Sequence, residues 1–373
     1  MLDGEQALLA VYVVWHPRFD RGQPLADLLF KTLCGDPYLP AVRALGIPVR
    51  FRTALESEEL PRPIAFDAAE HTAVIVLVDN ELVADADWSD FVVDLLGQAR
   101  SGHDVVVPVA ITRNAFNLPP EISEVVNFQR LYEVIDPGLV APVLMNRITH
   151  DLCEILDPDT AVQVFISHAK EDGVTTAREV RQYIHTLTGL TDFFDATAIP
   201  DGSKFADVIK DAMEESALLV VHTDRYSSRE WCRLEVLEAK RRRKPILVLA
   251  AAREGEARSF PYIGNVPVVC WVDGSPWNME RVVGGLLREV LRSRYFPAWM
   301  ERVCSLHGLT LDRDAFSYPP ELLTALQLHV EAAGAPVGQY LYPDPPLGTE
   351  ELQLLTDLDP TLIPLTPTTL VAS

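Results

Sequence analysis

The sequence predicts an α/β protein of two domains, in each of which helices cover both faces of a parallel β-sheet. Three observations predict this fold. Short apolar runs of strand length recur along the chain, longer stretches with helical patterns separate them, and the same order of segments occurs twice. The chain has 373 residues, of which 48% are hydrophobic and 23% charged, so it has the length and composition of two globular domains.

The strands are predicted from apolar runs bounded by polar or turn residues. Helical patterns lie between these runs, and strands that alternate with helices are typical of a parallel sheet. In chain order the runs are Leu8–Trp15, Ala73–Val78, Asp104–Ile111, Val162–Ser167, Leu218–Thr223 and Pro245–Ala250.

An internal repeat sets the domain boundaries. Residues 10–33 resemble residues 163–184, residues 71–96 resemble residues 216–239, and DVVVPVAI resembles KPILVLAA. The order and spacing of the blocks agree. We therefore predict four parts in the chain: a first domain at 1–135, a linker at 136–159, a second domain at 160–298 and a C-terminal extension at 299–373.

The extension contains YLYPDPPLGTEELQLL (Tyr340–Leu355), whose prolines predict an extended lead-in to a short helix. We expect Thr349 to cap this helix, which would begin at Glu350. We expect the extension to pack against the second domain, and the alternative is a contact with a partner or a lid over a site.

The charge of the chain excludes one class of partner. The formal net charge is −22, and binding to phosphate backbones needs a basic face, so we expect no nucleic acid as a general partner. The run Arg241–Lys244 is the one dense positive patch. It is either a solvated helix end, where cations suit the helix dipole, or a contact for an acidic face of a neighbouring copy.

Cysteine usage and hydropathy indicate the compartment. The five cysteines form no CxxC pair, so we expect neither a metal site nor a disulfide framework. The N-terminus has Asp3 and Glu5 where a signal peptide has basic residues. No apolar run approaches the roughly 18 residues of a membrane span. We expect a cytoplasmic protein that does not bind a membrane.

Polar residues gather at strand ends in the second domain. VFISHAKED (Val164–Asp172) places Ser167, His168 and Lys170 at the carboxyl end of a predicted strand, where open α/β sheets bind ligands. DFFDATAIPDGSKF (192–205) predicts a strand, a loop with turn residues, and a helix that begins near Ser203.

One helix, in YSSREWCRLEVLEAK (226–240), presents an unusual pair. Trp231 and Glu235 are four residues apart and so share one side of the helix. We expect Leu234, Leu237 and Val236 to supply its core face. A solvated carboxylate is the usual fate of such a glutamate, and a site wall is the alternative.

These blocks, in this order, resemble a TIR domain. FISHAKED is similar to the box 1 of that family, residues 196–202 to its BB loop, and SREWCRLE to its WCxxE pattern. The resemblance covers roughly residues 163–295 and implies a flavodoxin-like fold. The first domain resembles a degenerate copy.

The resemblance implies two kinds of function. Some TIR domains are scaffolds, and others cleave NAD+ at the bond between nicotinamide and ribose, with the glutamate of the WCxxE pattern as the catalytic residue. By position that residue is Glu235. The resemblance also implies NAD+ as substrate rather than a bound cofactor, homo-oligomers through TIR–TIR contacts, and an upstream sensor protein in antiviral defence.

Further residues are candidates for binding the substrate. Trp231 would shape the pocket beside the carboxylate, and Lys170 stands near the place where the family often has an arginine for the phosphates. Phe194 and Asp195 would line the base pocket, although core packing explains Phe194 equally well. Ser203 is either a contact or a helix cap.

The first domain is expected to lack this chemistry. In the aligned repeat, Trp88 stands at the place of Trp231 and Val92 at the place of Glu235, and VVWHPRFD replaces FISHAKED. Asp94 lies nearby but out of register. We therefore predict an NAD+ hydrolase in the second domain that yields nicotinamide and ADP-ribose or a cyclic variant. The alternative is a non-catalytic TIR adaptor.

Overall fold

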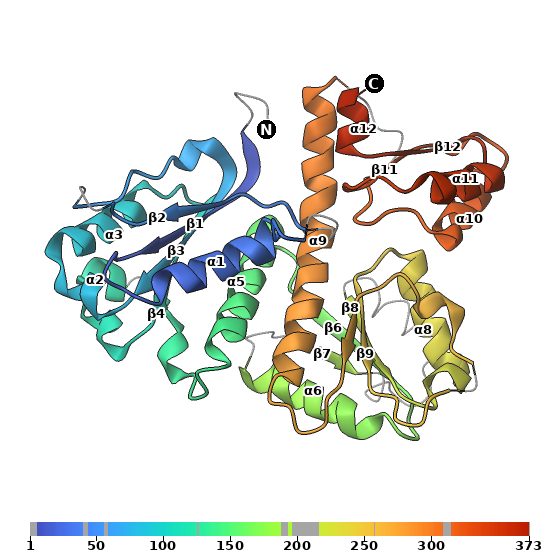
Figure 1. Ribbon diagram of the computed structural model, residues 1–373, viewed down its shortest axis with the longest axis horizontal. Coiled ribbons are helices and arrows are strands. Elements are labelled where there is room, and N and C mark those ends of the chain that lie inside the picture. Colours follow the sequence, from blue (N-terminus) through green and yellow to red (C-terminus); the bar gives the residue numbers. More distant parts are fainter. Residues whose placement is uncertain are drawn as a thin grey trace. The chain divides into compact units, whose positions relative to one another are not determined.

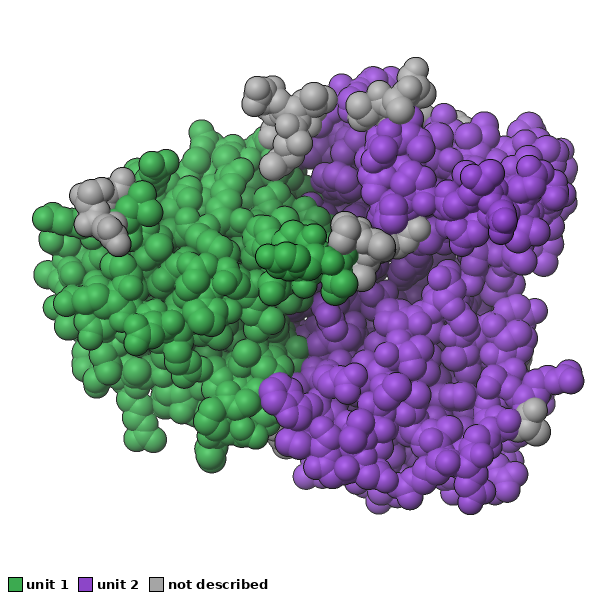
Figure 2. All heavy atoms as spheres, viewed as in Figure 1, with its two compact units in different colours: residues 1–148 green, residues 149–373 purple. Residues whose placement is uncertain are grey.

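The computed structural model describes residues 6–39, 44–55, 59–124, 127–187, 193–195, 216–256, 258–308 and 315–372. The chain divides into two compact units, Met1–Ile148 and Thr149–Ser373 (Figures 1 and 2).

The first unit contains a five-stranded parallel sheet with the order β2-β1-β3-β4-β5. The central strands β1 and β3 are almost wholly apolar and buried, as expected for a sheet covered on both faces. The strands are β1 (Ala7–Trp15), β2 (Val49–Arg52), β3 (Ala69–Val78), β4 (Asp104–Ala110) and β5 (Gln129–Arg130).

Helices lie on both faces of this sheet (Figure 1). The buried side of α3 packs on one face through Trp88, Val92 and Leu95, which belong to the same apolar cluster as Tyr12 and Val14 of β1. Short helical turns η1 (Phe66–Ala68), η2 (Arg113–Asn117) and η3 (Leu131–Glu133) lie in the connections. The helices are α1 (Gly22–Leu33), α2 (Asn80–Ala84), α3 (Ala86–Gln98), α4 (Pro120–Ser123) and α5 (Val140–Leu156).

The second unit contains another five-stranded parallel sheet, with the order β10-β9-β8-β6-β7. The strands are β6 (Gln163–His168), β7 (Phe193–Asp195), β8 (Ser216–His222), β9 (Ile246–Ala250) and β10 (Val268–Cys270).

The helices of the second sheet also lie on opposite faces. Helix α8 packs on one face through Cys232, Val236 and Ala239. On the other face α9 approaches closely, because Gly285 leaves room for the side chain of Leu247 on β9. The elements are α6 (Val174–Leu187), η5 (Tyr226–Ser228), α8 (Glu230–Arg241), η6 (Pro261–Ile263) and α9 (Asn278–Leu306).

Both sheets have the strand order of flavodoxin-like folds. Counted within each unit, the order is 2-1-3-4-5 in both cases. The structure confirms the predicted α/β class and all six predicted strands to within a few residues at each end.

The expected domain borders fall in or beside helices. The interval 136–159, expected as a linker, contains α5, and α9 runs without a break through the expected border at 298. No helix in the described ranges has the length and apolar character that crossing a membrane requires.

The C-terminal extension has its own small core and packs against the second sheet domain. Lys240 at the end of α8 pairs with Glu321 at 2.8 Å, and the guanidinium of Arg243 lies 4.2 Å from the ring centroid of Phe316. These contacts confirm the expected packing. The extension consists of α10 (Leu322–Glu331), β11 (Gly338–Leu341), α11 (Thr349–Leu358), β12 (Leu362–Leu365) and α12 (Pro367–Ala372).

The expected cap of the last long helix is wrong by one residue. Helix α11 begins at Thr349, and its N-cap is Gly348. The backbone N–H of Gly348 donates to Glu351 Oε2 at 2.9 Å, so the glutamate of the third helical position satisfies the cap instead of a threonine hydroxyl.

Candidate functional site

The site begins at the carboxyl end of β6. Ser167 is the next-to-last residue of this strand and is 1% exposed. Its side chain projects toward α8, since its hydroxyl contacts Glu235 of that helix. Strand alternation explains this direction, because Phe165, two residues earlier, packs in the same cluster as α8.

The core face of α8 differs from the sequence expectation. Its buried positions are Cys232, Glu235, Val236, Glu238 and Ala239, whereas Leu234 is 42% exposed. The expectation that Leu234 lies in the core is therefore wrong. Helix α8 directs Glu235 inward and Leu234 outward. This arrangement buries less apolar surface than the reverse would, which favours a specific role for the carboxylate.

Glu235 belongs to a hydrogen-bonded chain of three buried side chains. It is 4% exposed and accepts a short hydrogen bond from the hydroxyl of Ser167. The hydroxyl of Tyr226 lies 2.6 Å from the Ser167 oxygen. Because Ser167 uses its single proton toward the carboxylate, Tyr226 is the donor to Ser167. The order of donation is thus Tyr226 to Ser167 to Glu235.

The surroundings of the carboxylate change the titration of its neighbours. Burial, and then the negative charge of Glu235, raise the pKa of Tyr226 well above its ordinary value. The same two causes raise the pKa of Cys232 to about 12. Tyr226 therefore stays a hydrogen-bond donor and Cys232 stays a thiol at neutral pH. Cys232 is 4% exposed, as a packed and unreactive cysteine is.

Tyr226 is the functional candidate that sequence reasoning missed. It lies in η5, nine residues before Glu235, and is fully buried. The sequence did hold a signal for it, a tyrosine in the polar stretch YSSRE after a strand. A tyrosine buried in such a place needs a hydrogen-bond partner for its hydroxyl.

Other predicted residues lie nearer the surface. Trp231, in the first turn of α8, is 48% exposed, so the two members of the predicted pair differ in burial although they are one turn apart. His168 is half-buried, and its Nδ1 lies 3.4 Å from the carbonyl oxygen of Ile166. Lys170 is exposed.

Three predicted residues fall on or beside the undescribed part of the chain. Phe194 and Asp195 lie in β7, where their backbones pair with Phe165 and Ile166 of β6. This register places them beside the strand that carries Ser167. Ser203 lies outside the described residues, as does the stretch 196–202 that resembles the BB loop.

Ionic contacts join the loop after β6 to the loop before α8. Asp172 accepts hydrogen bonds from the Thr223 hydroxyl at 2.7 Å and from the backbone N–H of Arg225 at 3.0 Å. Glu171 pairs with Arg229 and with Arg225. These contacts hold the two segments that present Ser167 and Glu235.

A second polar network lies at the end of β8. His222 Nε2 is 3.0 Å from Glu256 Oε2, and Ser227 donates to Glu256 from both its backbone and its hydroxyl. Burial alone would raise the pKa of Glu256, but these hydrogen bonds outweigh it and lower the pKa. His222 thus has a structural partner.

The equivalent place in the first unit is apolar in either alignment of the two helices. In the predicted alignment Val92, which is fully buried, holds the place of Glu235. The buried apolar residues Trp88, Val92 and Leu95 also have the spacing of Cys232, Val236 and Ala239, and this second alignment puts Phe91 at the place of Glu235.

The sheet register completes this comparison. In the first unit Val14 pairs with Val76, which lies two residues before the end of β3. In the second unit Ser167 pairs with Val220, which lies two residues before the end of β8, so Val14 and Ser167 hold the same position. Val14 thus takes the place of the serine, and both candidates for the place of the glutamate, Phe91 and Val92, are apolar. Asp94 is exposed. The first unit has no carboxylate at this place.

Two cavities in the second unit are not lined by Glu235. One of about 520 Å³ opens at the carboxyl ends of the strands, and its lining includes Asp172, Glu179, Asp224 and Asp273. Its acidic lining disfavours phosphates. The other, of about 550 Å³, lies where the end of α8 meets the C-terminal extension.

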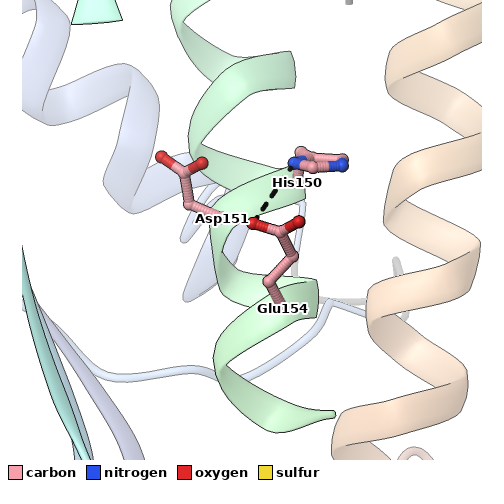
Figure 3. A group of neighbouring side chains, drawn as sticks. All are labelled: His150, Asp151 and Glu154. Atoms are coloured by element: carbon pink, nitrogen blue, oxygen red, sulfur yellow. Dashed lines mark ion pairs between the residues drawn. The ribbon is translucent and has the colours of Figure 1, made fainter. Parts of the chain in front are cut away.

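One group in the described part of the chain has metal-ligand geometry. His150, Asp151 and Glu154 of α5 offer ligand atoms within 4.8 Å of one another (Figure 3). Burial lowers the pKa of His150. The negative charge of Glu154 acts in the opposite direction, and the positive charge of Arg294 lowers the pKa further. The positive charge of Arg294 near His150 disfavours a bound cation here.

Sequence comparison matches a part of the second unit to a known family. Residues 164–281 match the family model described as TIR domain, and this range holds Ser167, Tyr226 and Glu235. The match does not extend into the first unit. No curated protein matches the chain.

Proposed function

Because residues 164–281 form a TIR domain, we propose that this domain hydrolyses NAD+ with Glu235 as its catalytic residue. The family includes enzymes that cleave NAD+ and scaffolds that only assemble. The observation that carries the proposal is the burial of Glu235 beside Ser167 at the carboxyl end of the sheet.

A buried carboxylate is costly unless its charge is used or compensated. Removing a carboxylate from water costs several kcal/mol, and a neutral hydroxyl donor such as Ser167 returns only part of it. A scaffold would lose nothing by placing an apolar residue here, as the first unit does in either alignment. Retaining a charged residue at such a cost favours chemistry, since functional sites are where such groups gather.

The reaction requires what one carboxylate can supply. The bond between the anomeric carbon of the ribose and the nicotinamide nitrogen breaks, and its electron pair neutralises the pyridinium nitrogen. Nicotinamide therefore leaves without a proton. Positive charge develops at the anomeric carbon, and a nearby carboxylate in a dry site stabilises it. A water oxygen then bonds to that carbon and releases a proton, which gives ADP-ribose. Attack by a nucleophile of the same molecule gives a cyclic product.

The donors to Glu235 set its orientation. Ser167 holds one carboxylate oxygen, Oε2, and Tyr226 holds Ser167. A carboxylate held in this way accepts a ribose hydroxyl or faces the anomeric carbon without first reorganising, which is the advantage of a preorganised site.

Access to the carboxylate makes assembly part of the proposal. At 4% exposure Glu235 does not meet a substrate unless neighbouring residues move. We propose that contacts between TIR domains of two copies open the site and supply part of its wall, so that resting activity is low. On this account the protein is an assembly-activated defence effector with NAD+ as substrate and a sensor protein upstream.

The test follows nicotinamide release from NAD+ by the purified full chain, over a range of protein concentrations and with a crowding agent. The proposal expects release that rises more steeply than linearly with protein concentration. A chain that oligomerises under these conditions but releases no nicotinamide would support the adaptor alternative. Chromatography of the product separates linear from cyclic ADP-ribose.

A further inference from the structure

Two arginines of the edge strand β2 converge on one tyrosine of β1 in the first unit. Arg50 Nη1 donates to the hydroxyl of Tyr12 at 2.6 Å, and the guanidinium carbon of Arg52 lies 4.8 Å from the centre of the Tyr12 ring. Tyr12 is fully buried, so the two guanidinium groups that contact it lie over the apolar face of the sheet.

This positive group has no carboxylate partner among the described residues. Arg50 and Arg52 bond to Tyr12 and to the carbonyl of Phe51, and neither forms an ion pair with any described acidic residue. Burial is the largest cause that lowers the pKa of Arg52, and the charges of Arg50 and Arg62 add to it while Tyr12 opposes it. In a chain with 54 acidic residues, like charges gathered without a counter-charge are unusual.

Two hydrogen-bonding atoms in the same place have no partner. The Nε of Arg52 and the hydroxyl of Thr53 are both buried and unbonded. Leaving a buried donor unsatisfied costs about 1–3 kcal/mol, so a native structure rarely holds two on adjacent residues. A guanidinium N–H and a hydroxyl are both donors that an oxyanion would satisfy.

The position in the fold is one where ligands bind. Arg52 ends β2 and lies opposite Val14 of β1, at the carboxyl edge of a sheet whose order turns between β1 and β3. Among the described residues between β2 and β3, η1 is the only helical segment.

We propose that Arg50, Arg52 and Thr53, here named the β2 cluster, bind a phosphoryl group. Arginine presents N–H donors in a planar fork that matches the oxygens of a phosphoryl group, and a dianion offsets the repulsion between the guanidinium groups. The group comes either from free phosphate or from a nucleotide. The first unit would then be a ligand-binding domain that has the sheet of a TIR domain without its carboxylate. The proposal does not rest on NAD+ hydrolysis by the second unit.

The experiment measures binding of inorganic phosphate, ADP-ribose and adenosine to the full chain by calorimetry, with melting temperature as a second readout. The variants are Arg52→Gln and Thr53→Val. The matched control is Arg130→Gln, which removes the same charge from an exposed arginine of the same unit whose side chain is 56% exposed.

Phosphate or ADP-ribose is expected to bind the wild type and to raise its melting temperature, and adenosine is not. Arg52→Gln is expected to weaken this affinity about tenfold or more, as the loss of a charge-assisted hydrogen bond does, and Arg130→Gln to leave it unchanged. Binding of ADP-ribose without free phosphate identifies a nucleotide ligand, and binding of both identifies the phosphoryl group as sufficient.

Thr53→Val keeps the test independent of folding. It replaces an unbonded buried hydroxyl by a methyl group, so the ligand-free variant is expected to be at least as stable as the wild type, yet to bind more weakly. Equal affinity of wild type, Arg52→Gln and Thr53→Val would show an adventitious ion only. That result, or no binding of either phosphate or ADP-ribose by the wild type, would overturn the proposal.

Discussion

Ser167 at the end of β6 donates a hydrogen bond to the buried carboxylate of Glu235 on α8. The two residues are 68 positions apart in the chain, and each explains the other's burial. The buried carboxylate needs a hydrogen-bond donor, and Ser167 supplies it. In the first unit the same strand position is held by the apolar residue Val14.

Removing the serine hydroxyl should therefore cost stability. Ser167→Ala leaves a buried carboxylate with one donor fewer, and the expected loss is about 1–3 kcal/mol in the free energy of unfolding. Urea unfolding with hydrogen exchange of β6 and α8 amides measures it. The control is Ser228→Ala, which removes an exposed hydroxyl that bonds to the Arg225 carbonyl. Equal stability of the two variants would contradict the role given to Ser167.

The thiols should react in the order of their burial. Burial raises the pKa of both Cys153 and Cys232 to about 12, so both are protonated at pH 8, and Cys270 is exposed. A thiol-exchange reagent is expected to label Cys270 in the native chain and to reach Cys153 and Cys232 only in denaturant. Peptide mass spectrometry assigns the label. Rapid native labelling of Cys232 would contradict the buried environment described for Glu235.

The C-terminal extension should loosen when its aromatic contact is removed. Phe316 is 4% exposed and stacks on Tyr340, with ring centroids 3.8 Å apart, while Arg243 covers it from the second sheet domain. Phe316→Ala is expected to cost about 3–5 kcal/mol within the extension. Limited proteolysis should then cleave the extension faster than in Leu322→Ala, which removes a side chain that is 56% exposed. Equal cleavage rates would show that the extension does not depend on this contact.

Asp359 should stabilise the extension in a defined pH range. Hydrogen bonds from Thr361, and then from His329, lower the pKa of Asp359 from 3.8 to about 2. A lowered carboxyl pKa stabilises the folded state above the unfolded value, and this contribution is lost as the pH falls from about 4 toward 2. The urea midpoint of Asp359→Asn should lie below that of wild type at pH 7, and the difference should shrink over this range. Asp357→Asn, at an exposed site, is the control and should show no such pH dependence.

The sequence predicted the elements whose cause is local. Six strands were predictable because each is an apolar run with turn signals at its ends. The BB-loop stretch and Ser203 remain predictions, since they lie outside the described residues. The binding roles of Lys170 and Trp231 also stay predictions, because exposure alone does not test a contact with substrate.

The errors arose where helix rotation and not composition decided burial. Leu234 was expected inside because it is apolar, but the helix turns Glu235 inward toward Ser167, and only the tertiary partner reveals this. Tyr226 was missed because its partner lies 59 residues away.

Nicotinamide release by Glu235→Gln, compared with wild type at a protein concentration where the wild type assembles, tests the central claim most directly. Glutamine keeps the size of the side chain and one acceptor oxygen for the Ser167 hydroxyl, and it removes the charge. The account predicts that the variant folds and assembles as the wild type does and loses at least about 100-fold in rate, as the removal of an electrostatic stabiliser does. Equal release by the variant and the wild type would contradict the role of Glu235.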